Sequence, residues 1–234
     1  RRMIFCAKAL GKPYEKYEQM INEYSAAVVK EYFDEATGDF FGNIQGANAF
    51  ALDCGLGNEK TLENIIKKYS KKTEFDTGIF GTEILLRVLY KSGNGNLATR
   101  LLANKGDVSF DFMRRSGATT LWENWNGEAS HSHPMFGAST EFLFERILGI
   151  MQEEGSVRYD RITVAPVFPK CLDRAKGRIT TPHGEIGVSW ERIQEGIKVC
   201  IDLCDGIAAV LTSNKTIPLK NGRNEIVISK EDIQ

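Results

Sequence analysis

The pattern of apolar and polar positions divides the chain into a longer helical part and a shorter β part. Between residues 14 and 32, apolar side chains recur at steps of three and four, which predicts an amphipathic helix. These residues are Tyr14, Tyr17, Ile21, Tyr24, Val28 and Tyr32. Pro13 precedes the stripe and suits the start of a helix. We interpret the tyrosine stripe as a packing surface between paired helices rather than a ligand-binding surface.

More helices are predicted downstream, separated by short breaks rich in glycine and asparagine. They cover about 44–55, 58–72, 79–93, 95–113 and 136–150. Because the connections are short, neighbouring helices are expected to pair as antiparallel hairpins. Residues 1–10 already look like the end of a helix, with no cap before them. We therefore expect the sequence to begin inside a domain.

The pattern changes after Gly155, where short apolar runs alternate with turn residues. The runs are 161–168, 184–192, 196–203, 206–213 and 224–230. Such spacing is typical of an all-β sandwich. Residues 184–203 read as two strands joined by a turn at Glu195-Gly196, and His183 reads as a turn residue. We expect a mainly α, then β architecture, with helices over 1–152 and a small antiparallel β-sandwich over 153–234.

Composition narrows the classes of function. The net charge of −1 argues against nucleic-acid binding, which normally requires a strongly basic domain. No apolar run reaches the roughly 18 residues needed to cross a bilayer, so no membrane partner is expected. The five cysteines follow no CxxC spacing, which favours neither a disulfide framework nor a zinc site.

The densest chemistry lies in the stretch SGATTLWENWNGEASHSHPMFG, residues 116–137. Glu123 stands between Trp122 and Trp125, and His131 and His133 follow. Pyranose rings stack their C–H faces on aromatic side chains, while their hydroxyls pair with carboxylates and imidazoles. A carboxylate can also act as a general acid or base in glycoside cleavage. The stretch therefore indicates a sugar site.

Other interpretations of the same stretch stay open. The Trp-Glu-x-Trp segment can equally be a loop anchored in the core, with its glutamate capping a backbone group. Two histidines one residue apart, without further ligands, are a weak metal motif, so neither a metal nor a cofactor is expected. No GxGxxG, P-loop or GxSxG arrangement is present.

Longer strings of the sequence resemble bacterial α-L-rhamnosidases of glycoside hydrolase family 78. The strongest is GATTLWENWNG followed by SHSHPMFGASTEFLFERILGI. GNIQGANAFALDCGL and TGIFGTEILLRVLYKSGNGNLATRLL are similar to two helical segments of that family, in the same order. The tail, with TVAPVFP and RITTPHGEIGVSWER, resembles its small C-terminal β-sandwich. The resemblance covers nearly the whole chain.

This resemblance implies an (α/α)6 barrel of six helical hairpins, with inverting glycoside hydrolysis at its mouth. Six hairpins need about twelve helices, more than some 150 residues supply at typical helix lengths. We therefore expect residues 1–152 to be the C-terminal part of such a barrel, with its first half outside this sequence.

The resemblance also implies roles for individual residues. The family's general base falls on Glu123, and its sugar-contacting histidine falls on His133. Trp122 or Trp125 supplies a wall of the sugar pocket, and the sequence does not decide which. Ser132 and Pro134 depart from the family pattern around that histidine. The general acid belongs to an earlier motif that has no match here, so this chain alone is expected to be inactive or nearly so.

The implied partner is a rhamnose-containing glycoside or oligosaccharide, cleaved at its terminal α-L-rhamnosyl residue. The incomplete barrel would expose apolar surface, so we expect the chain to associate through it. A non-catalytic sugar-binding homologue and another six-hairpin glycosidase or lyase are the alternatives, because a fold does not fix a function. The compartment, cytoplasm or periplasm of a bacterium, stays open.

Overall fold

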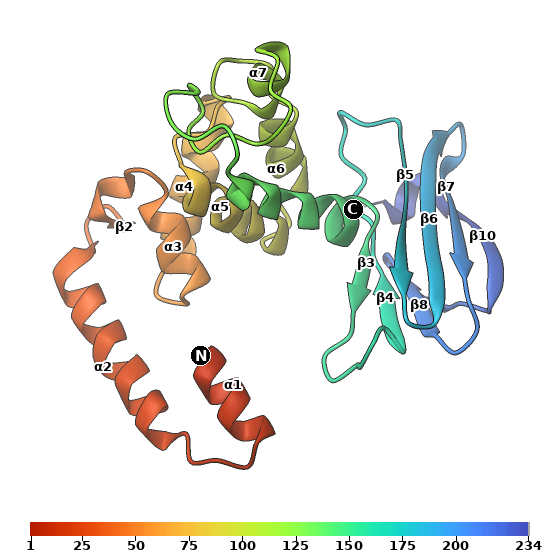
Figure 1. Cartoon of the computed structure of the whole chain (residues 1–234), viewed down its shortest axis with the longest axis horizontal. Coiled ribbons are helices and arrows are strands. Elements are labelled where there is room, and N and C mark those ends of the chain that lie inside the picture. Colours follow the sequence, from red (N-terminus) through yellow and green to blue (C-terminus); the bar gives the residue numbers. More distant parts are fainter. Residues whose placement is uncertain (234) are drawn as a thin grey trace. The chain divides into compact units, whose positions relative to one another are not determined.

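The computed structural model describes residues 1–233, which form two compact units (Figure 1). The first unit is Arg1–Val88 and the second begins at Leu89, within helix α5 (Ile79–Lys91). Gln234, the last residue of the expected β domain, lies outside the described residues. The domain boundary between residues 152 and 153 stays a prediction. The predicted order, helices followed by strands, is confirmed.

Helices dominate the first unit. Helix α1 (Arg2–Ala9) packs against α2 (Glu15–Tyr32), and the short strands β1 (Phe33–Asp34) and β2 (Asp39–Phe40) follow. The 3₁₀ helix η1 (Phe41–Asn43), α3 (Ala47–Asp53), α4 (Glu59–Lys71) and the start of α5 complete it. The helices expected over 14–32, 44–55, 58–72 and 79–93 are therefore all present.

Local sequence explains where α4 begins. The side chain of Asn58 accepts a hydrogen bond from the backbone N–H of Thr61 at 3.0 Å. The Thr61 hydroxyl in turn accepts one from the backbone N–H of Asn58 at 3.2 Å. This reciprocal cap satisfies two N–H groups that a helix start leaves without partners.

The interpretation of the tyrosine stripe as packing surface is wrong at Tyr24 and Tyr32, whereas the other four residues of the stripe are half-buried. No residue of α2 is buried, and Tyr24 and Tyr32 are 65% and 45% exposed. Met3 and Phe5 of α1 are also exposed, as is Leu10 directly after it. Periodicity identifies the apolar face of a helix, but it does not show that another element covers that face.

The second unit begins with helices that the sequence pattern joined into one. Helix α6 (Gly95–Leu102) and helix α7 (Phe110–Arg115) replace the single helix expected over 95–113. Between them the side chain of Asn104 accepts a hydrogen bond from the backbone of Gly106, which turns the chain. Ser109 then caps α7 through the backbone N–H of Phe112.

A 3₁₀ helix, η2 (Pro134–Thr140), and a π-helix, η3 (Leu143–Ile147), follow a long loop. They correspond to the helix expected over 136–150, which ends earlier because of Gly149. Gly149 has a positive φ of 75°, a conformation that side chains disfavour. A Cβ there would clash with backbone atoms of Ala165 and Pro166.

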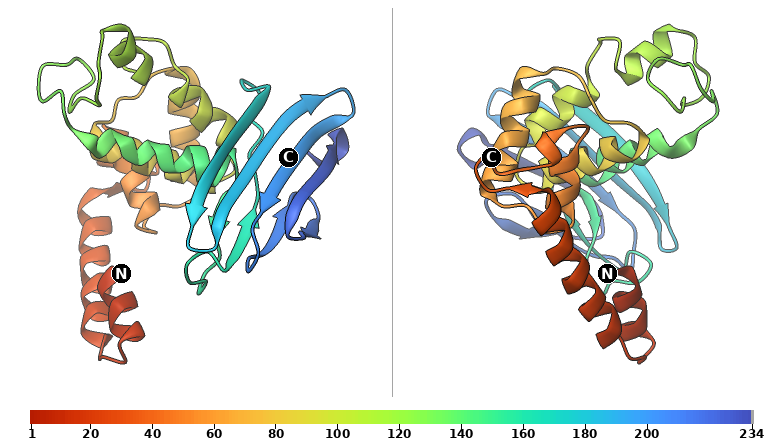
Figure 2. Two further views of the ribbon diagram at one scale, coloured as in Figure 1. Left: turned by 45° about the vertical axis from the view of Figure 1, so that its right-hand side comes forward. Right: turned by 90° about the vertical axis from the view of Figure 1, so that its left-hand side faces the viewer.

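Two four-stranded sheets make up the rest of the chain (Figure 2). The first has the order β10-β7-β6-β5 and is antiparallel throughout. Its strands are β5 (Arg174–Thr181), β6 (Gly184–Ile193), β7 (Gly196–Leu203) and β10 (Gly222–Ser229). The predicted hairpin over 184–203 is β6 and β7, and His183 lies in the turn before β6. The 3₁₀ helix η4 (Lys230–Asp232) follows β10.

The second sheet has the order β3-β4-β8-β9. Its strands are β3 (Ile150–Gln152), β4 (Arg161–Val164), β8 (Ala208–Thr212) and β9 (Thr216–Pro218). Strands β4 and β8 pair in parallel, so this sheet is mixed and not purely antiparallel as expected. Strands β3, β5 and β9 were not among the predicted apolar runs, since the outer positions of β5 are polar and the other two are short.

Alternation along the strands builds the core between the sheets. Ile186, Val188 and Trp190 of β6 are buried, as are Val199 and Ile201 of β7. Each buried apolar side chain of this size contributes about 1.5–3 kcal/mol. The indole N–H of Trp190 donates a hydrogen bond of 2.7 Å to the carbonyl of Ile147. The sandwich is thereby joined to the end of η3.

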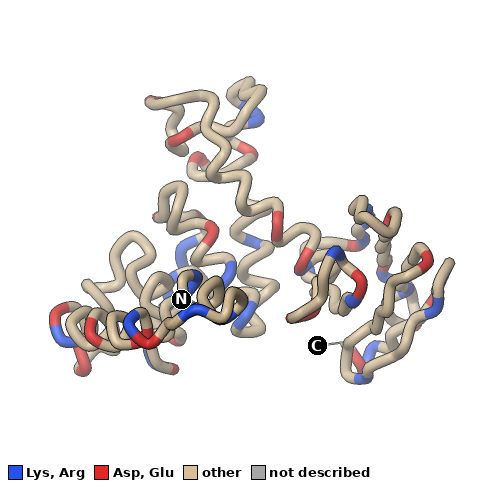
Figure 3. The backbone as a smooth tube through the Cα atoms, turned by 60° about the horizontal axis from the view of Figure 1, so that its bottom comes forward, with Lys and Arg blue, Asp and Glu red and all other residues tan. Residues whose placement is uncertain are grey.

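Charged residues are mixed along helices and strands alike (Figure 3). Basic and acidic positions alternate over short distances, in keeping with the net charge of −1. Among the described residues, no helix combines the length and the apolar character that crossing a membrane requires.

The exposed apolar side chains of the first unit predict self-association. We expect the light-scattering mass to rise above that of one chain as concentration increases, because large apolar patches bind one another. Phe5→Glu with Tyr24→Glu should abolish the rise, whereas Val157→Glu, which changes a side chain 64% exposed in the second unit, should not. A single-chain mass at every concentration would contradict this prediction.

Gly149 predicts a sharp difference between two glycine substitutions in the second unit. Gly93→Ala should cost about 1 kcal/mol, because Gly93 has a φ of 77° but an added Cβ would meet nothing within 4 Å. Gly149→Ala should cost about 3 kcal/mol, since overpacking against the backbone adds about 1–3 kcal/mol. Urea unfolding followed by tryptophan fluorescence measures both, and equal losses would refute the packing argument.

Candidate active site

The candidate active site is the loop of residues 116–133, called here the Glu123 loop. It begins where α7 ends at Arg115 and finishes where Pro134 opens η2. Gly117 leaves the helix with a φ of 82°, which favours glycine. Proline suits the first position of the next helix because its missing N–H would have no partner there.

Hydrogen bonds fold the Glu123 loop back on itself. The backbone N–H of Glu123 donates to the carbonyl of Ser130 at 2.8 Å, and that of His133 donates to Leu121 at 2.8 Å. The hydroxyl of Thr120 also donates to the carbonyl of His131. Residues 120–123 therefore run beside residues 130–133. This brings two predicted site residues, Glu123 and His133, onto facing segments of one loop.

Trp122 anchors this loop. Its side chain is only 6% exposed and stacks on His131, with ring centroids 4.7 Å apart and planes 17° apart. The edge of Phe112 from α7 packs against it at 6.3 Å. Gly127 also lies close, because a Cβ there would be 2.8 Å from the indole ring. An indole so enclosed offers little surface to a sugar.

His131 is occupied by the same packing. Besides stacking on Trp122, its Nε2 is hydrogen-bonded to the carbonyl of Gly127 at 2.8 Å. The sequence offers His131 as a partner for sugar hydroxyls, but in the folded chain this imidazole holds the loop together.

Trp125 is half-buried and packs on the helices that flank the loop. The centroid of its ring lies 4.0 Å from the ring centroid of Phe136 on η2 and 5.2 Å from that of Phe110 on α7. Phe110, Leu121 and Phe136 also line a neighbouring hollow of about 250 Å³, which is mostly apolar. Neither Glu123 nor His133 lines that hollow.

The carboxylate of Glu123 is half-buried and accepts one weak hydrogen bond, from the backbone N–H of Ser130 at 3.4 Å. Within residues 1–233, no lysine, arginine or histidine forms an ion pair with it. A carboxylate without a cationic partner retains lone pairs for a proton donor such as water.

His133 is half-buried, and its Nδ1 has no hydrogen-bond partner among the described residues. Leaving such an atom unsatisfied costs about 1–3 kcal/mol, so native proteins rarely do so without a functional or structural reason. The atom is suited to a hydroxyl or water brought by a ligand.

Sequence reasoning missed one titratable group on η3, Glu145. Burial raises the pKa of its carboxyl, and the neighbouring carboxylate of Glu141 raises it further. The available signal was the spacing of four residues between two glutamates on one helix. Among the described residues, no group of three or more histidine, cysteine, aspartate or glutamate side chains is arranged to hold a metal ion.

Two family models cover most of the chain. The bacterial alpha-L-rhamnosidase 6 hairpin glycosidase domain matches residues 1–147, and the bacterial alpha-L-rhamnosidase C-terminal domain matches residues 149–215. An alpha-L-rhamnosidase of Formosa agariphila is 31% identical over 203 residues, covering 79% of this chain and 22% of the relative. One of an Alteromonas species is 28% identical over 212 residues, covering 83% and 23%. The chain thus spans about a fifth of their length.

Solved structures share the fold. An alpha-L-rhamnosidase from Dictyoglumus thermophilum superposes with a TM-score of 0.80 at 24% identity, over 96% of this chain and 30% of that one. The Streptomyces avermitilis alpha-L-rhamnosidase complexed with L-rhamnose gives a TM-score of 0.77 at 21% identity, over 95% and 24%. The first family model alone covers more than half of the sequence, and this chain therefore belongs to the bacterial α-L-rhamnosidase family.

Proposed function

We propose that this chain supplies the general-base side of an inverting glycosidase site that removes terminal α-L-rhamnosyl residues from rhamnosides. The observation that carries the proposal is the surroundings of the Glu123 carboxylate. Its carboxylate is held on a loop anchored by an indole, and no cation pairs with it within residues 1–233. A base must accept a proton, and an ion pair would oppose that step by stabilising the charged form.

In the proposed reaction, Glu123 takes a proton from a water molecule while the oxygen of that water attacks the anomeric carbon of rhamnose. The glycosidic bond breaks on the opposite face of the ring, and a second carboxyl group donates a proton to the departing oxygen. The two carboxyl groups of an inverting enzyme stand about 6.5–9.5 Å apart, which leaves room for the water. We propose that the acid comes from outside residues 1–234.

Two further side chains complete the proposed sugar site. His133 contacts a sugar hydroxyl through its ring, and the buried Nδ1 without a partner supports this role. Of the two tryptophans that the sequence left open as a wall, we assign Trp125, because it is the more exposed. Trp122 then acts as a positioning residue that fixes the backbone around Glu123.

Family membership supports the substrate class. The relatives from Formosa agariphila and the Alteromonas species are alpha-L-rhamnosidases, and the Streptomyces avermitilis relative was solved with L-rhamnose. Since the chain spans about a fifth of its relatives, the activity is proposed for the complete enzyme that contains it.

Glu123→Gln in the complete enzyme should lower kcat for an aryl α-L-rhamnoside about 10²–10⁴-fold, because an amide cannot accept the proton from water. Glu128→Gln is the matched control, since Glu128 lies in the same loop and is exposed. Circular dichroism should show that both variants stay folded. Activity of Glu123→Gln close to that of the control would show that the base is misassigned.

Residues 1–234 alone should hydrolyse the same substrate at least about 10²-fold more slowly than the Formosa agariphila relative, because one catalytic carboxyl is absent. Turnover at a comparable rate would contradict this expectation.

With the complete enzyme, nuclear magnetic resonance should detect the β anomer of L-rhamnose first. The α anomer would indicate retention, an unsaturated product absorbing in the ultraviolet would indicate a lyase, and binding without turnover a non-catalytic homologue.

A further inference from the structure

The outer face of the sheet β10-β7-β6-β5 carries charged and small polar side chains, whereas its inner face is apolar. On β6, Val188 and Trp190 are buried in the core, while Ser189 and Glu191 point the other way. This alternation follows from the period of two along a strand. A row of outward side chains therefore crosses neighbouring strands at the same level.

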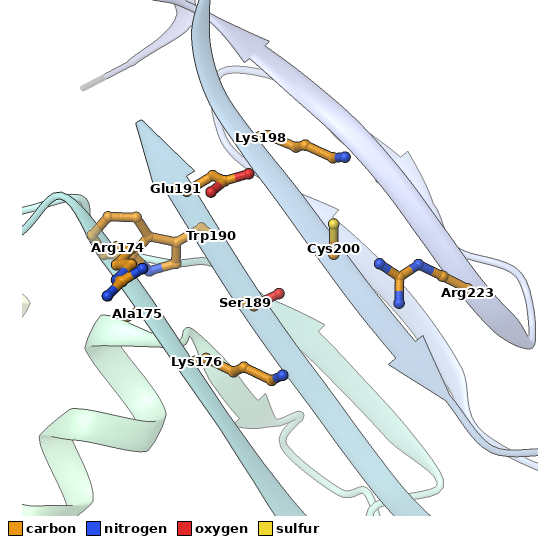
Figure 4. A pocket seen from close by; sticks show the side chains of 9 residues that line it. All are labelled: Arg174, Ala175, Lys176, Ser189, Trp190, Glu191, Lys198, Cys200 and Arg223. Carbon is orange, nitrogen blue, oxygen red and sulfur yellow. The ribbon is translucent and has the colours of Figure 1, made fainter. Parts of the chain in front are cut away.

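At the middle of this face lies a hollow of about 510 Å³ (Figure 4). Its floor is made by Ser189 and Cys200, which lie directly opposite each other on β6 and β7. Longer side chains from the flanking strands surround these two small ones. We call this hollow the basic trough and define it by Arg174, Lys176, Ser189, Lys198, Cys200 and Arg223.

The charges around the basic trough are unbalanced. Four cations line it, Arg174, Lys176, Lys198 and Arg223, and one carboxylate of the lining, Glu191, lies opposite Arg174 and Lys198 in the strand register. Two further carboxylates, Glu225 and Asp202, lie beside this lining and pair with Lys198 and Arg223, so the excess of positive charge lies at Arg174 and Lys176 on β5. Clefts lined by one sign of charge concentrate ligands of the opposite sign.

The four cations form two kinds of group. Lys198 and Arg223 both pair with Glu225, at 3.1 and 2.8 Å, which holds them at one side of the trough. Arg174 and Lys176 stand at the other side on β5, and within residues 1–233 no acidic side chain forms an ion pair with either. These two cations are thus available to an anionic ligand.

The basic trough is unsuited to the stacking by which neutral sugars usually bind. Trp190 borders it, but its side chain is only 2% exposed and its N–H is bonded to Ile147. Recognition must then rest on charge and hydrogen bonds. A guanidinium matches the two oxygens of a carboxylate or sulfate, and an ammonium adds a point charge. The volume lies in the range of about 300–1,000 Å³ typical of small-molecule sites.

We propose that the basic trough binds anionic groups, carboxylate or sulfate ester, on a carbohydrate chain. The carbohydrate part of the proposal rests on the proposed function, because the family to which the chain belongs acts on glycosides. A nucleic acid fits less well, since its binding normally requires a basic domain and this chain is slightly acidic. Acidic saccharides would thereby be retained through the C-terminal sheet.

Isothermal titration of residues 1–234 at low salt tests the proposal with four probes. They are trigalacturonate, sulfated galactotriose, uncharged galactotriose and a short single-stranded DNA. We expect at least one acidic saccharide to bind about tenfold or more tightly than the neutral one, with affinity falling as salt rises. The tighter of the two acidic probes distinguishes carboxylate from sulfate. No binding of either, equal binding of the neutral sugar or tighter binding of the DNA would overturn the proposal.

Variants locate the binding. Arg174→Gln combined with Lys176→Gln should weaken acidic saccharides at least about tenfold, because charge-assisted hydrogen bonds are lost. Lys215→Gln, which removes an exposed lysine near the other sheet, is the matched control and should bind normally. Ser189→Asp, which keeps every cation but adds a carboxylate to the floor, should also weaken binding. Unchanged affinity in Ser189→Asp or in a folded double variant would refute the assignment.

A final variant separates this proposal from the proposed function. Glu123→Gln should bind acidic saccharides as the unmodified chain does, because Glu123 is not part of the basic trough. If rhamnoside hydrolysis is absent from the complete enzyme while this binding persists, only the proposed function fails. Loss of the binding in Glu123→Gln would instead overturn the role of the trough.

Discussion

The stack of Trp122 on His131 is the interaction on which the candidate site depends. A loop of this length has a high conformational entropy, and backbone hydrogen bonds at its surface compete with water. Burying an indole against an imidazole, with the edge of Phe112 beside it, gives the loop a small core of its own. The pairing of Glu123 with Ser130 and of His133 with Leu121 then has one geometry. The proposed base, Glu123, is the immediate neighbour of the buried tryptophan.

A second buried indole has a comparable role at the junction between helices and strands. Trp190 fills the core of the sandwich, and its N–H satisfies the carbonyl of Ile147, where η3 ends. Gly149 permits the close approach of the following backbone. The β-sandwich and the helices that flank the Glu123 loop therefore belong to one compact unit, so the two family domains share packing across their boundary.

Two features of this chain are in keeping with its covering about a fifth of its relatives' length. They are the exposed apolar side chains of the first unit and the presence of one candidate catalytic carboxylate, Glu123. An inverting site needs two carboxyl groups, and this chain, about a fifth of its relatives in length, offers a candidate for one of them. The basic trough adds a different kind of contact, because it recognises charge and has no exposed ring.

Sequence by itself determined the order of helices and strands, the β6–β7 hairpin and the family, because these depend on periodicity and on a long specific motif. It also singled out Glu123, His133 and the two tryptophans as candidates, since tryptophan, histidine and glutamate are concentrated in that loop. Tertiary structure decided which tryptophan is buried, that His131 pairs within the loop, that two tyrosines of the α2 stripe are left exposed, and that 95–113 contains two helices. It also decided that four cations from three strands surround one hollow. The hollow depends on residues distant in sequence meeting in space, and local patterns do not encode such meetings. The break within 95–113 instead depends on short-range hydrogen bonds of Asn104 and Ser109, which the apolar periodicity does not report.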